Sequence, residues 1–365
     1  MRIVGLIGGG RSGIDFFQSL LDEHDEILQF PHHFHFGDFY QKVNKIKDED
    51  EILSIFIKDN KRCFDSRLNQ IERHDKLGEN KNEFYQVDEN LFKSHFKKLS
   101  QNKDLDIFKI LFNLHAAYYL ANNKGIGNKK IIVLHLHHIE KLKFLNQLNI
   151  EVIYTIREPF SSISSYINHW MKIKSIYEIT PYSYFYYLNR IFNGLKKLSQ
   201  MGIKTHVIKL ESLHKKNVNV MKEFCFILNI KYSNVLTQST FMGKKWWGDQ
   251  FSLKFLNGVN KNFQIKYDEN LFYKKDIRVL EFFLQDYMKH YGYAFHTNKK
   301  INMLEKFLPL KTEIIIWKKF FHKFNFLQLF YALVYWLKRI SIMRKNNFKD
   351  FIMPHSLGEE SNYEK

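Results

Sequence analysis

The stretch GLIGGGRSGIDFFQSLLDEH, residues 5–24, decides the fold of this 365-residue chain. An apolar run over residues 3–7 indicates a buried strand, and three consecutive glycines follow it. Arg-Ser-Gly comes next at 11–13, and the apolar spacing over 13–22 predicts a helix. Because glycines between a strand and a helix let backbone N–H groups converge on a phosphate, the stretch predicts a phosphate-binding loop.

The loop departs from the common nucleotide-phosphate pattern at one position. The spacing from Gly5 to Ser12 reads G-x-x-x-x-G-R-S, with Arg11 where that pattern has lysine. Arginine is a fixed cation that binds phosphate oxygens in bidentate fashion. An NTPase also needs an Asp at the end of a neighbouring strand to hold Mg²⁺. The candidate strands end in LHLHH, TIREP and KLESL, so an NTP hydrolase or kinase is the weaker interpretation.

Strand patterns return along the chain at 26–30, 130–135, 151–156 and 204–210, with helical patterns between them. This βαβα alternation with near-continuous apolar strands predicts a parallel sheet covered on both faces. We therefore expect an α/β fold of the P-loop NTPase-like kind, with three α/β/α layers around a central parallel sheet. In such sheets, ligands bind at the C-terminal ends of the strands.

The chain divides by composition into three expected parts. The first is a main domain over 1–300, in which the charged, helical pattern of 40–125 predicts an insertion on the substrate side. The second is a basic, aromatic helical extension over 301–350, and the third is a disordered tail over 351–365. Aromatic and basic residues interleave from 307 to 344. This pattern is typical either of a peripheral segment on an anionic membrane or of a helical pair packed on the core.

Composition limits the partners and the compartment. Lys plus Arg outnumber Asp plus Glu by 56 to 38, giving a formal charge of +18, which indicates an anionic partner. The two cysteines form no disulfide framework, and no apolar run is long enough for a secretory signal or a membrane span. We expect a cytoplasmic protein, with membrane association only at its surface.

A second motif lies in EVIYTIREPFSSISSYINHW, residues 151–170. Arg157 stands at the end of the expected strand, and Ser165 follows eight residues later in the expected helix. Serines at the start of a helix are often ordinary caps. The alternative is that Arg157 and Ser165 hold a second phosphate of the ligand bound by the first loop.

Taken together, the two motifs resemble the family of sulfotransferases that use 3′-phosphoadenosine 5′-phosphosulfate (PAPS). That family has a P-loop-type α/β fold, with an R-S-G-T-[ST] loop for the 5′-phosphosulfate and a strand followed by R-[DE]-P and a serine for the 3′-phosphate. Segments 19–27, 207–213 and 241–252 also resemble family segments, in family order, so the likeness covers roughly residues 1–255.

The resemblance implies PAPS as donor and a set of residues that bind it: Gly10, Arg11, Ser12, Gly13, Ile14, Asp15, Arg157, Ser165, Gly243, Lys244 and Lys245. Arg11 is also expected to act on the transferred group. Ile14 and Asp15 depart from the hydroxyl residues of the family loop, and Asp15 brings a negative charge near the phosphate. An acid in the first turn of a helix is also favourable in itself.

Sulfuryl transfer to a hydroxyl needs a base, and two histidine clusters qualify, QFPHHFHF over 29–36 and LHLHH over 134–138. His32 falls where tyrosylprotein sulfotransferase-like members carry a catalytic Glu. We expect His32 or His33 as the base, then His137. Loop packing is the alternative role, and zinc binding is a weaker interpretation because no Cys or acid joins the histidines at a familiar spacing. The sequence thus predicts a site without a metal.

The expected activity is in-line transfer of a sulfuryl group from PAPS to a hydroxyl of a carbohydrate or glycolipid-type acceptor. A divergent P-loop kinase or NTPase is one alternative. The other is a basic protein that binds membrane or nucleic acid and retains a vestigial P-loop fold. Neither alternative explains Arg157-Glu158-Pro159 with Ser165, and we expect no nucleic-acid partner.

Overall fold

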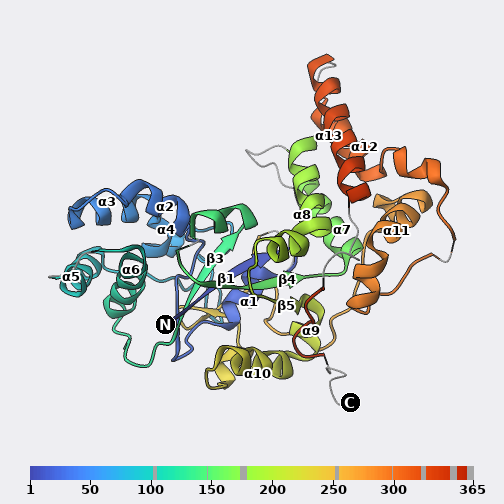
Figure 1. Ribbon diagram of the computed structural model, residues 1–365. Helices are drawn as coiled ribbons and strands as arrows, with labels where there is room; N and C mark the ends of the chain where they lie inside the picture. The colour runs from blue at the N-terminus through green and yellow to red at the C-terminus, as the bar shows by residue number, and fades with distance from the viewer. Residues whose placement is uncertain are drawn as a thin grey trace.

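A computed structural model describes residues 1–101, 105–145, 147–172, 179–250, 255–297, 299–321, 326–345 and 352–359. At its centre lies a sheet of five parallel strands in the order β2-β3-β1-β4-β5 (Figure 1). The strands are β1 (Arg2–Gly8), β2 (Ile27–Gln29), β3 (Ile131–His137), β4 (Ile150–Ile156) and β5 (Thr205–Lys209). Their side chains are almost all buried, as the apolar runs in the sequence predict.

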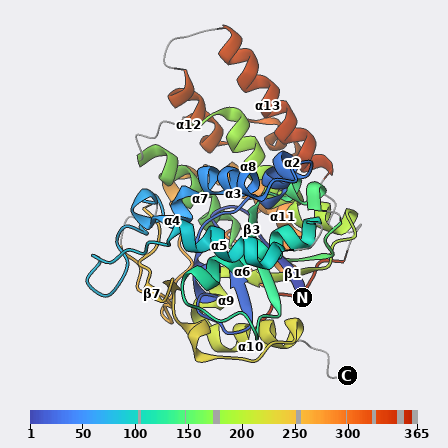
Figure 2. The same cartoon turned by 90° about the vertical axis from the view of Figure 1, so that its left-hand side faces the viewer.

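Helices lie on both sides of this sheet, with α8 on one side and α10 on the other in both views (Figures 1 and 2). The helices outside the insertion and the extension are α1 (Ile14–Leu20), α7 (Pro159–Lys172), α8 (Pro181–Gln200), α9 (Leu210–Lys215), α10 (Asn217–Leu228) and α11 (Lys274–His290). Short 3₁₀ turns are η2 (Ile139–Leu145), η3 (Asn234–Thr237) and η4 (Glu269–Leu271), and a small hairpin pairs β6 (Thr240–Phe241) with β7 (Lys244–Lys245). The predicted α/β fold with a central parallel sheet is confirmed.

The register of the sheet determines where a ligand can bind. Strand β1 lies between β3 and β4, with Ile7 opposite His137 on one side and Gly8 opposite Thr155 on the other. The C-terminal ends of these three strands therefore meet at one edge, where ligands bind in open parallel sheets. Arg157 follows directly on β4, so it reaches the same edge as the glycine loop.

The region between β2 and β3 is helical, as the sequence predicts for 40–125. It contains α2 (Phe36–Val43), α3 (Glu49–Asp59), α4 (Lys61–Phe64), η1 (Ser66–Leu68), α5 (Glu89–Ser100) and α6 (Ile107–Ala121). Helix α6 packs on β2 and against α5. Phe34, Phe56 and Phe92 stack in a fully or almost fully buried cluster. This aromatic packing attaches the insertion to the sheet.

The C-terminal extension forms η5 (Met303–Phe307), α12 (Lys311–Phe320) and α13 (Phe326–Lys345), and α13 packs along α8. Inside it, the fully buried Arg339 pairs with Glu313 at 3.1 Å and donates to the Leu308 carbonyl at 2.9 Å. The start of α13 extends beyond the rest of the molecule (Figures 1 and 2). Among the residues described, no helix has both the length and the apolar character needed to cross a bilayer.

The predicted disordered tail is wrong for residues 352–359. Ser356 pairs with Val207 of β5, and Leu357 is buried and donates its N–H to the Val207 carbonyl at 2.9 Å. The segment thereby covers the exposed edge of the sheet, which would otherwise leave backbone groups unpaired. Residues 351 and 360–365 lie outside the described part of the chain.

Candidate active site

The glycine loop after β1 is tightly curled. Gly10, Arg11 and Gly13 have φ values of 91°, 45° and 79°, in the left-handed region. At Gly10 a Cβ atom would lie 2.4 Å from the Tyr187 ring, so the backbone approaches its neighbour too closely for any other residue. Successive turns of this kind aim backbone N–H groups at one point, which is the geometry of an anion-binding loop.

Arg11 and Ser12 point in different directions. The Nε of Arg11 donates to Ser165 Oγ at 3.3 Å, and its Nη1 lies 3.2 Å from Asp249 Oδ2. Ser12 is buried, and its hydroxyl is 2.9 Å from Thr155 Oγ1. Arg11 therefore faces the site, whereas the Ser12 side chain ties the loop to β4.

Arg157 joins the two motifs. Its Nη1 donates to the Arg11 carbonyl at 3.4 Å. Its Nε is buried and has no hydrogen-bond partner among the described residues. Burial lowers the pKa of Arg157, and Glu211 opposes that shift. The guanidinium is half-buried and lines a cavity, and its buried Nε–H is costly to leave unpaired, so Arg157 is well placed to receive an anionic ligand.

A cavity of about 900 Å³, which we call the donor cavity, opens at this edge of the sheet. All the predicted residues of both motifs line it, namely Gly10, Arg11, Ser12, Gly13, Ile14, Asp15, Arg157 and Ser165. The sequence analysis missed other lining residues, including Asn168, Arg190, His214, Gly258 and Asn260. The Gly- and Asn-containing run FLNGVN at 255–260 is the signal that would have found the last two.

The structure does not bring Gly243, Lys244 and Lys245 to the donor cavity. They lie on the β6–β7 hairpin, where Lys244 pairs with Glu83 and Lys245 with Glu79, each at 2.8 Å. None of the three lines the donor cavity in the described part of the chain. Other residues of the segment 241–252 do line the cavity, namely Trp246, Asp249 and Gln250, together with residues 255–260.

A second cavity of about 560 Å³, the histidine cavity, adjoins the first. It is lined by His32, His33 and His35 from the loop after β2, together with Asp59, Arg62 and Glu72 from the insertion. Four residues line both cavities, namely Arg11, Asp15, His137 and Asp249. A group held in one cavity can therefore reach a group held in the other across this shared wall.

Glu72 and Asp15 give the histidine cavity its charge. Glu72 Oε2 lies 3.2 Å from His32 Nδ1 and accepts from Asn69 Nδ2 at 2.9 Å. Although burial raises the pKa of Glu72, the charges of His33 and His32 hold it well below its usual range. Glu72 was missed by the sequence analysis because nothing in its local sequence links it to His32.

His33 lies between the two carboxylates. Its Nε2 is 2.9 Å from Asp15 Oδ1 and 3.4 Å from Glu72 Oε1. Burial lowers the pKa of His33, but Glu72 and Asp15 outweigh burial and raise it to about 9. Asp15, one of the two residues that depart from the expected hydroxyl pattern, thus contacts His33 from the wall that the two cavities share.

Comparison with known proteins finds several solved structures, among them two sulfotransferase domains. No family model matches the chain, and no curated protein matches its sequence. A sulfotransferase domain from the curacin biosynthetic pathway aligns with 89% of this chain and 99% of its own length, at 18% identity and a TM-score of 0.41. A sulfotransferase domain from the Synechococcus PCC 7002 olefin synthase aligns with 69% of this chain and 79% of its own length, at 12% identity and a TM-score of 0.38.

Proposed function

We propose that the protein is a sulfotransferase that moves a sulfuryl group from PAPS to a hydroxyl of a carbohydrate or glycolipid-type acceptor. The observation that carries this proposal is the half-buried Arg157 guanidinium beside the glycine loop, whose Nε atom is buried. Its Nε has no partner in the described structure, and the cavity that it lines has the size of a nucleotide site.

The donor would be held at its two charged ends. The curled loop from Gly10 to Gly13 offers backbone N–H groups to the 5′-phosphosulfate, and Arg11 supplies a cation there. Arg157 and Ser165 offer a guanidinium and a hydroxyl to the 3′-phosphate. Arg11 and Arg157 follow two different strands, and a ligand with two anionic ends accounts for two separate arginines better than a ligand with one.

The acceptor would enter through the histidine cavity. Its hydroxyl oxygen attacks sulfur across the shared wall, a new S–O bond forms, and the bond from sulfur to the 5′-phosphate oxygen breaks. Adenosine 3′,5′-bisphosphate then leaves with the electron pair of that bond. The proton of the acceptor hydroxyl goes to a histidine.

Of the three predicted bases, the contacts favour His32. Glu72 accepts from His32 Nδ1, which leaves the lone pair on Nε2 free to take the proton. The pKa of about 9 makes His33 largely protonated at neutral pH, so it is a poor base. Burial and the charge of His33 lower the pKa of His137 well below its usual range, so it is the weaker base.

Calorimetric titration with adenosine 3′,5′-bisphosphate tests the donor site. We expect wild-type binding, and a loss of at least about 30-fold in affinity in Arg157→Ala, because removing one partner of a buried charged contact costs about 2 kcal/mol or more. Arg67→Ala is the matched control, since Arg67 forms an exposed pair with Asp65 outside both cavities. No binding by wild type, or unchanged binding in Arg157→Ala, would contradict the proposal. Tighter binding of Mg²⁺-ATP would favour a kinase or NTPase.

We also propose that the extension contacts an anionic membrane. The side chains of Phe326, Leu327 and Phe330 at the start of α13 are 74%, 72% and 60% exposed, on a chain of formal charge +18. Cosedimentation of the full chain with phosphatidylserine vesicles should fall when these residues are changed to Ser. Phe226→Ser on α10 is the control, because Phe226 is also exposed (84%) but lies on the far side of the sheet. Equal sedimentation of all variants would overturn the membrane proposal.

A further inference from the structure

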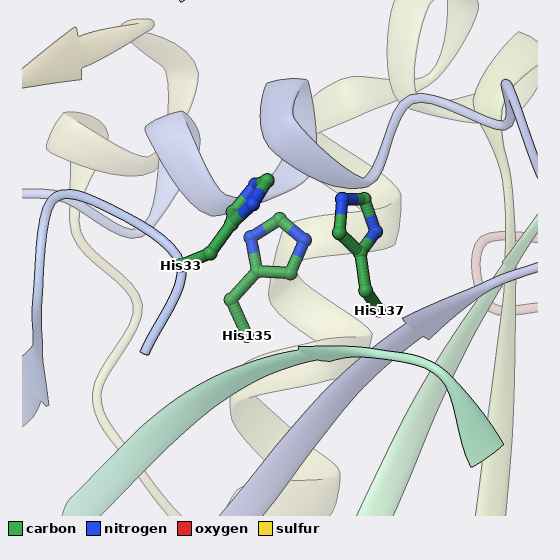
Figure 3. Close-up of side chains that lie close together, drawn as sticks. All are labelled: His33, His135 and His137. Atoms are coloured by element: carbon green, nitrogen blue, oxygen red, sulfur yellow. The ribbon is translucent and has the colours of Figure 1, made fainter. Parts of the chain in front are cut away.

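Three histidine rings converge beside the wall that the two cavities share, where His137 lines both cavities, His33 lines the histidine cavity and His135 is buried behind them. His33 comes from the loop after β2, and His135 and His137 come from the end of β3 (Figure 3). The ring centroids are 4.0 Å apart for His33 and His135, 4.3 Å for His33 and His137, and 4.7 Å for His135 and His137. The rings are tilted by 57° to 70°, so they do not form a simple stack.

Two hydrogen bonds of Gln18 determine which ring nitrogen of His135 carries the proton. Gln18 Nε2 donates to the Phe30 carbonyl at 2.8 Å, so the Gln18 oxygen must face the other way. That oxygen accepts from His135 Nδ1 at 2.6 Å. The lone pair of His135 is therefore on Nε2, which is fully buried and has no hydrogen-bond partner among the described residues. Histidines that bind metals are oriented by an outer acceptor in the same way.

His137 is held in a strained position. Its φ is 61°, and the β1–β3 register shifts at this point, so that Leu6 pairs with His135 and Ile7 with His137. Arg190 Nη2 donates to the His137 carbonyl at 2.9 Å and helps to hold the bulge. The bulge brings His137 to the other two rings, and its buried Nδ1 also lacks a partner in the described structure. A non-glycine residue at positive φ is strained, and such strain concentrates at functional sites.

The spacing of the ligand atoms suits a tetrahedral metal ion. Zn–N bonds of about 2.0–2.1 Å place neighbouring ligand atoms about 3.3–3.4 Å apart. Asp15 Oδ1 lies 2.9 Å from His33 Nε2 and 3.8 Å from His135 Nε2, on either side of that value. One nitrogen from each of the three histidines lies within 4.8 Å of the others. Small rotations of the rings would therefore bring all three nitrogens to bonding distance from one ion.

We propose that His33, His135, His137 and Asp15 bind a divalent transition-metal ion of the zinc class. Imidazole nitrogens favour such ions over Mg²⁺ and Ca²⁺, which prefer oxygen ligands. The acid that the sequence spacing did not supply comes from the glycine loop, so the ion would link the start of α1 to the end of β3. This inference is independent of the sulfotransferase proposal, because metal binding requires neither donor nor acceptor.

A neighbouring set, His32, His33 and Glu72, has similar spacing but a weaker case. Glu72 already accepts from Asn69 and lies against His32. A metal there would have to displace contacts that satisfy both groups. At the proposed site only the contact between His33 and Asp15 has to open, because His135 Nε2 and His137 Nδ1 have no partner among the described residues.

The test is titration of the full-length, chelator-treated protein with Zn²⁺ alone and with Co²⁺ alone. We expect one ion per chain and the intense visible absorption of tetrahedral Co²⁺. His135→Gln and His137→Gln should each lower the affinity by more than about 100-fold. Gln18→Leu should lower it by about 10- to 100-fold, because the orienting acceptor is lost while the ligands remain. Circular dichroism confirms that each variant is folded.

His206→Gln is the matched control, because His206 also lies near a carboxylate, 3.4 Å from Glu151, but outside both cavities. It should bind like wild type. The proposal is overturned if folded wild type takes up no stoichiometric ion, or if His135→Gln and His137→Gln bind normally. Loss of binding in His32→Gln alone would assign the ion to the neighbouring set and would equally overturn it.

Discussion

The donor cavity and the histidine cavity share a wall, yet they are built for opposite charges. The donor cavity has a curled backbone loop and two arginines, Arg11 and Arg157, at the ends of β1 and β4. Among its described lining residues, the histidine cavity combines imidazoles with five carboxylates, Asp15, Asp38, Asp59, Glu72 and Asp249, against three cationic side chains, Arg11, Lys42 and Arg62. The first therefore suits an anion, and the second suits a proton or a cation. A reaction between an anionic donor and a hydroxyl needs both environments side by side.

We expect a substitution in the histidine cavity to slow transfer without weakening donor binding, and a substitution in the donor cavity to weaken donor binding. The largest expected effect is that of Glu72→Gln on the rate of sulfuryl transfer from radiolabelled PAPS to an aryl glycoside. The rate should fall about 100-fold, because His32 loses the carboxylate that orients it and stabilises its charged form. Donor affinity should stay within about two-fold of wild type.

Glu83→Gln is the control for that experiment, since Glu83 pairs with Lys244 outside both cavities. If Glu72→Gln weakened binding of adenosine 3′,5′-bisphosphate as much as it slowed transfer, the two cavities would not be separable.

The next effect is on the donor side. Gly10→Ala should weaken binding of adenosine 3′,5′-bisphosphate by about 10- to 100-fold, because a left-handed alanine costs about 1–3 kcal/mol and its Cβ would meet Tyr187 at 2.4 Å. Gly202→Ala has the same kind of backbone strain (φ 67°) with nothing within 4 Å of the new Cβ. Titration of both variants separates the shape of the loop from general strain. Equal losses in the two would mean that the loop is not the donor site.

A smaller effect is expected at the shared wall. Asp249→Asn removes a carboxylate oxygen 3.2 Å from Arg11 Nη1, in a cavity proposed to hold an anion. Affinity for adenosine 3′,5′-bisphosphate should rise about two- to five-fold, and the gain should shrink at high salt. Asp65→Asn, whose carboxylate pairs with Arg67, provides the control. A drop in affinity would instead show that Asp249 positions Arg11 for binding.

The smallest effect is on the free energy of unfolding and comes from the pair formed by His296 and Glu158. Hydrogen bonding to Glu158 raises the pKa of His296, whose Nε2 lies 3.6 Å from Glu158 Oε1. A raised pKa means that the pair stabilises the fold fully below the unfolded histidine pKa of about 6.5, and that this contribution is lost as pH rises through the folded value. Urea unfolding should find wild type more stable than His296→Gln by less than about 1 kcal/mol at about pH 6. The difference should vanish by about pH 8.5, and a difference that grew with pH would contradict this assignment.

Local sequence predicted the donor cavity well, because each of its motifs lies within about a dozen consecutive residues. Strand, glycines and Arg11 are contiguous, and Arg157 and Ser165 are eight residues apart. Within the segment 241–252, Lys244 and Lys245 pair with acids on the insertion, whereas Trp246, Asp249 and Gln250 line the cavity together with the run around Gly258. Glycines and lysines occur at many places in this chain, so a short match to them does not determine which segment lies at the cavity.

By itself, the sequence determined the parallel sheet and the placement of the glycine loop, Arg157 and Ser165 at one cavity, because strand ends in a parallel sheet share one edge. The contact of Ser165 with Arg11 was decided only by the tertiary structure. Only the tertiary structure decided the histidine cavity. Glu72 reaches His32 across 40 residues, Gln18 reaches His135 across 117, and Asp15 turns to His33 through the fold of two loops. Such contacts depend on how the insertion and α1 pack against β3, and packing between distant segments leaves no periodic or spaced pattern in the chain.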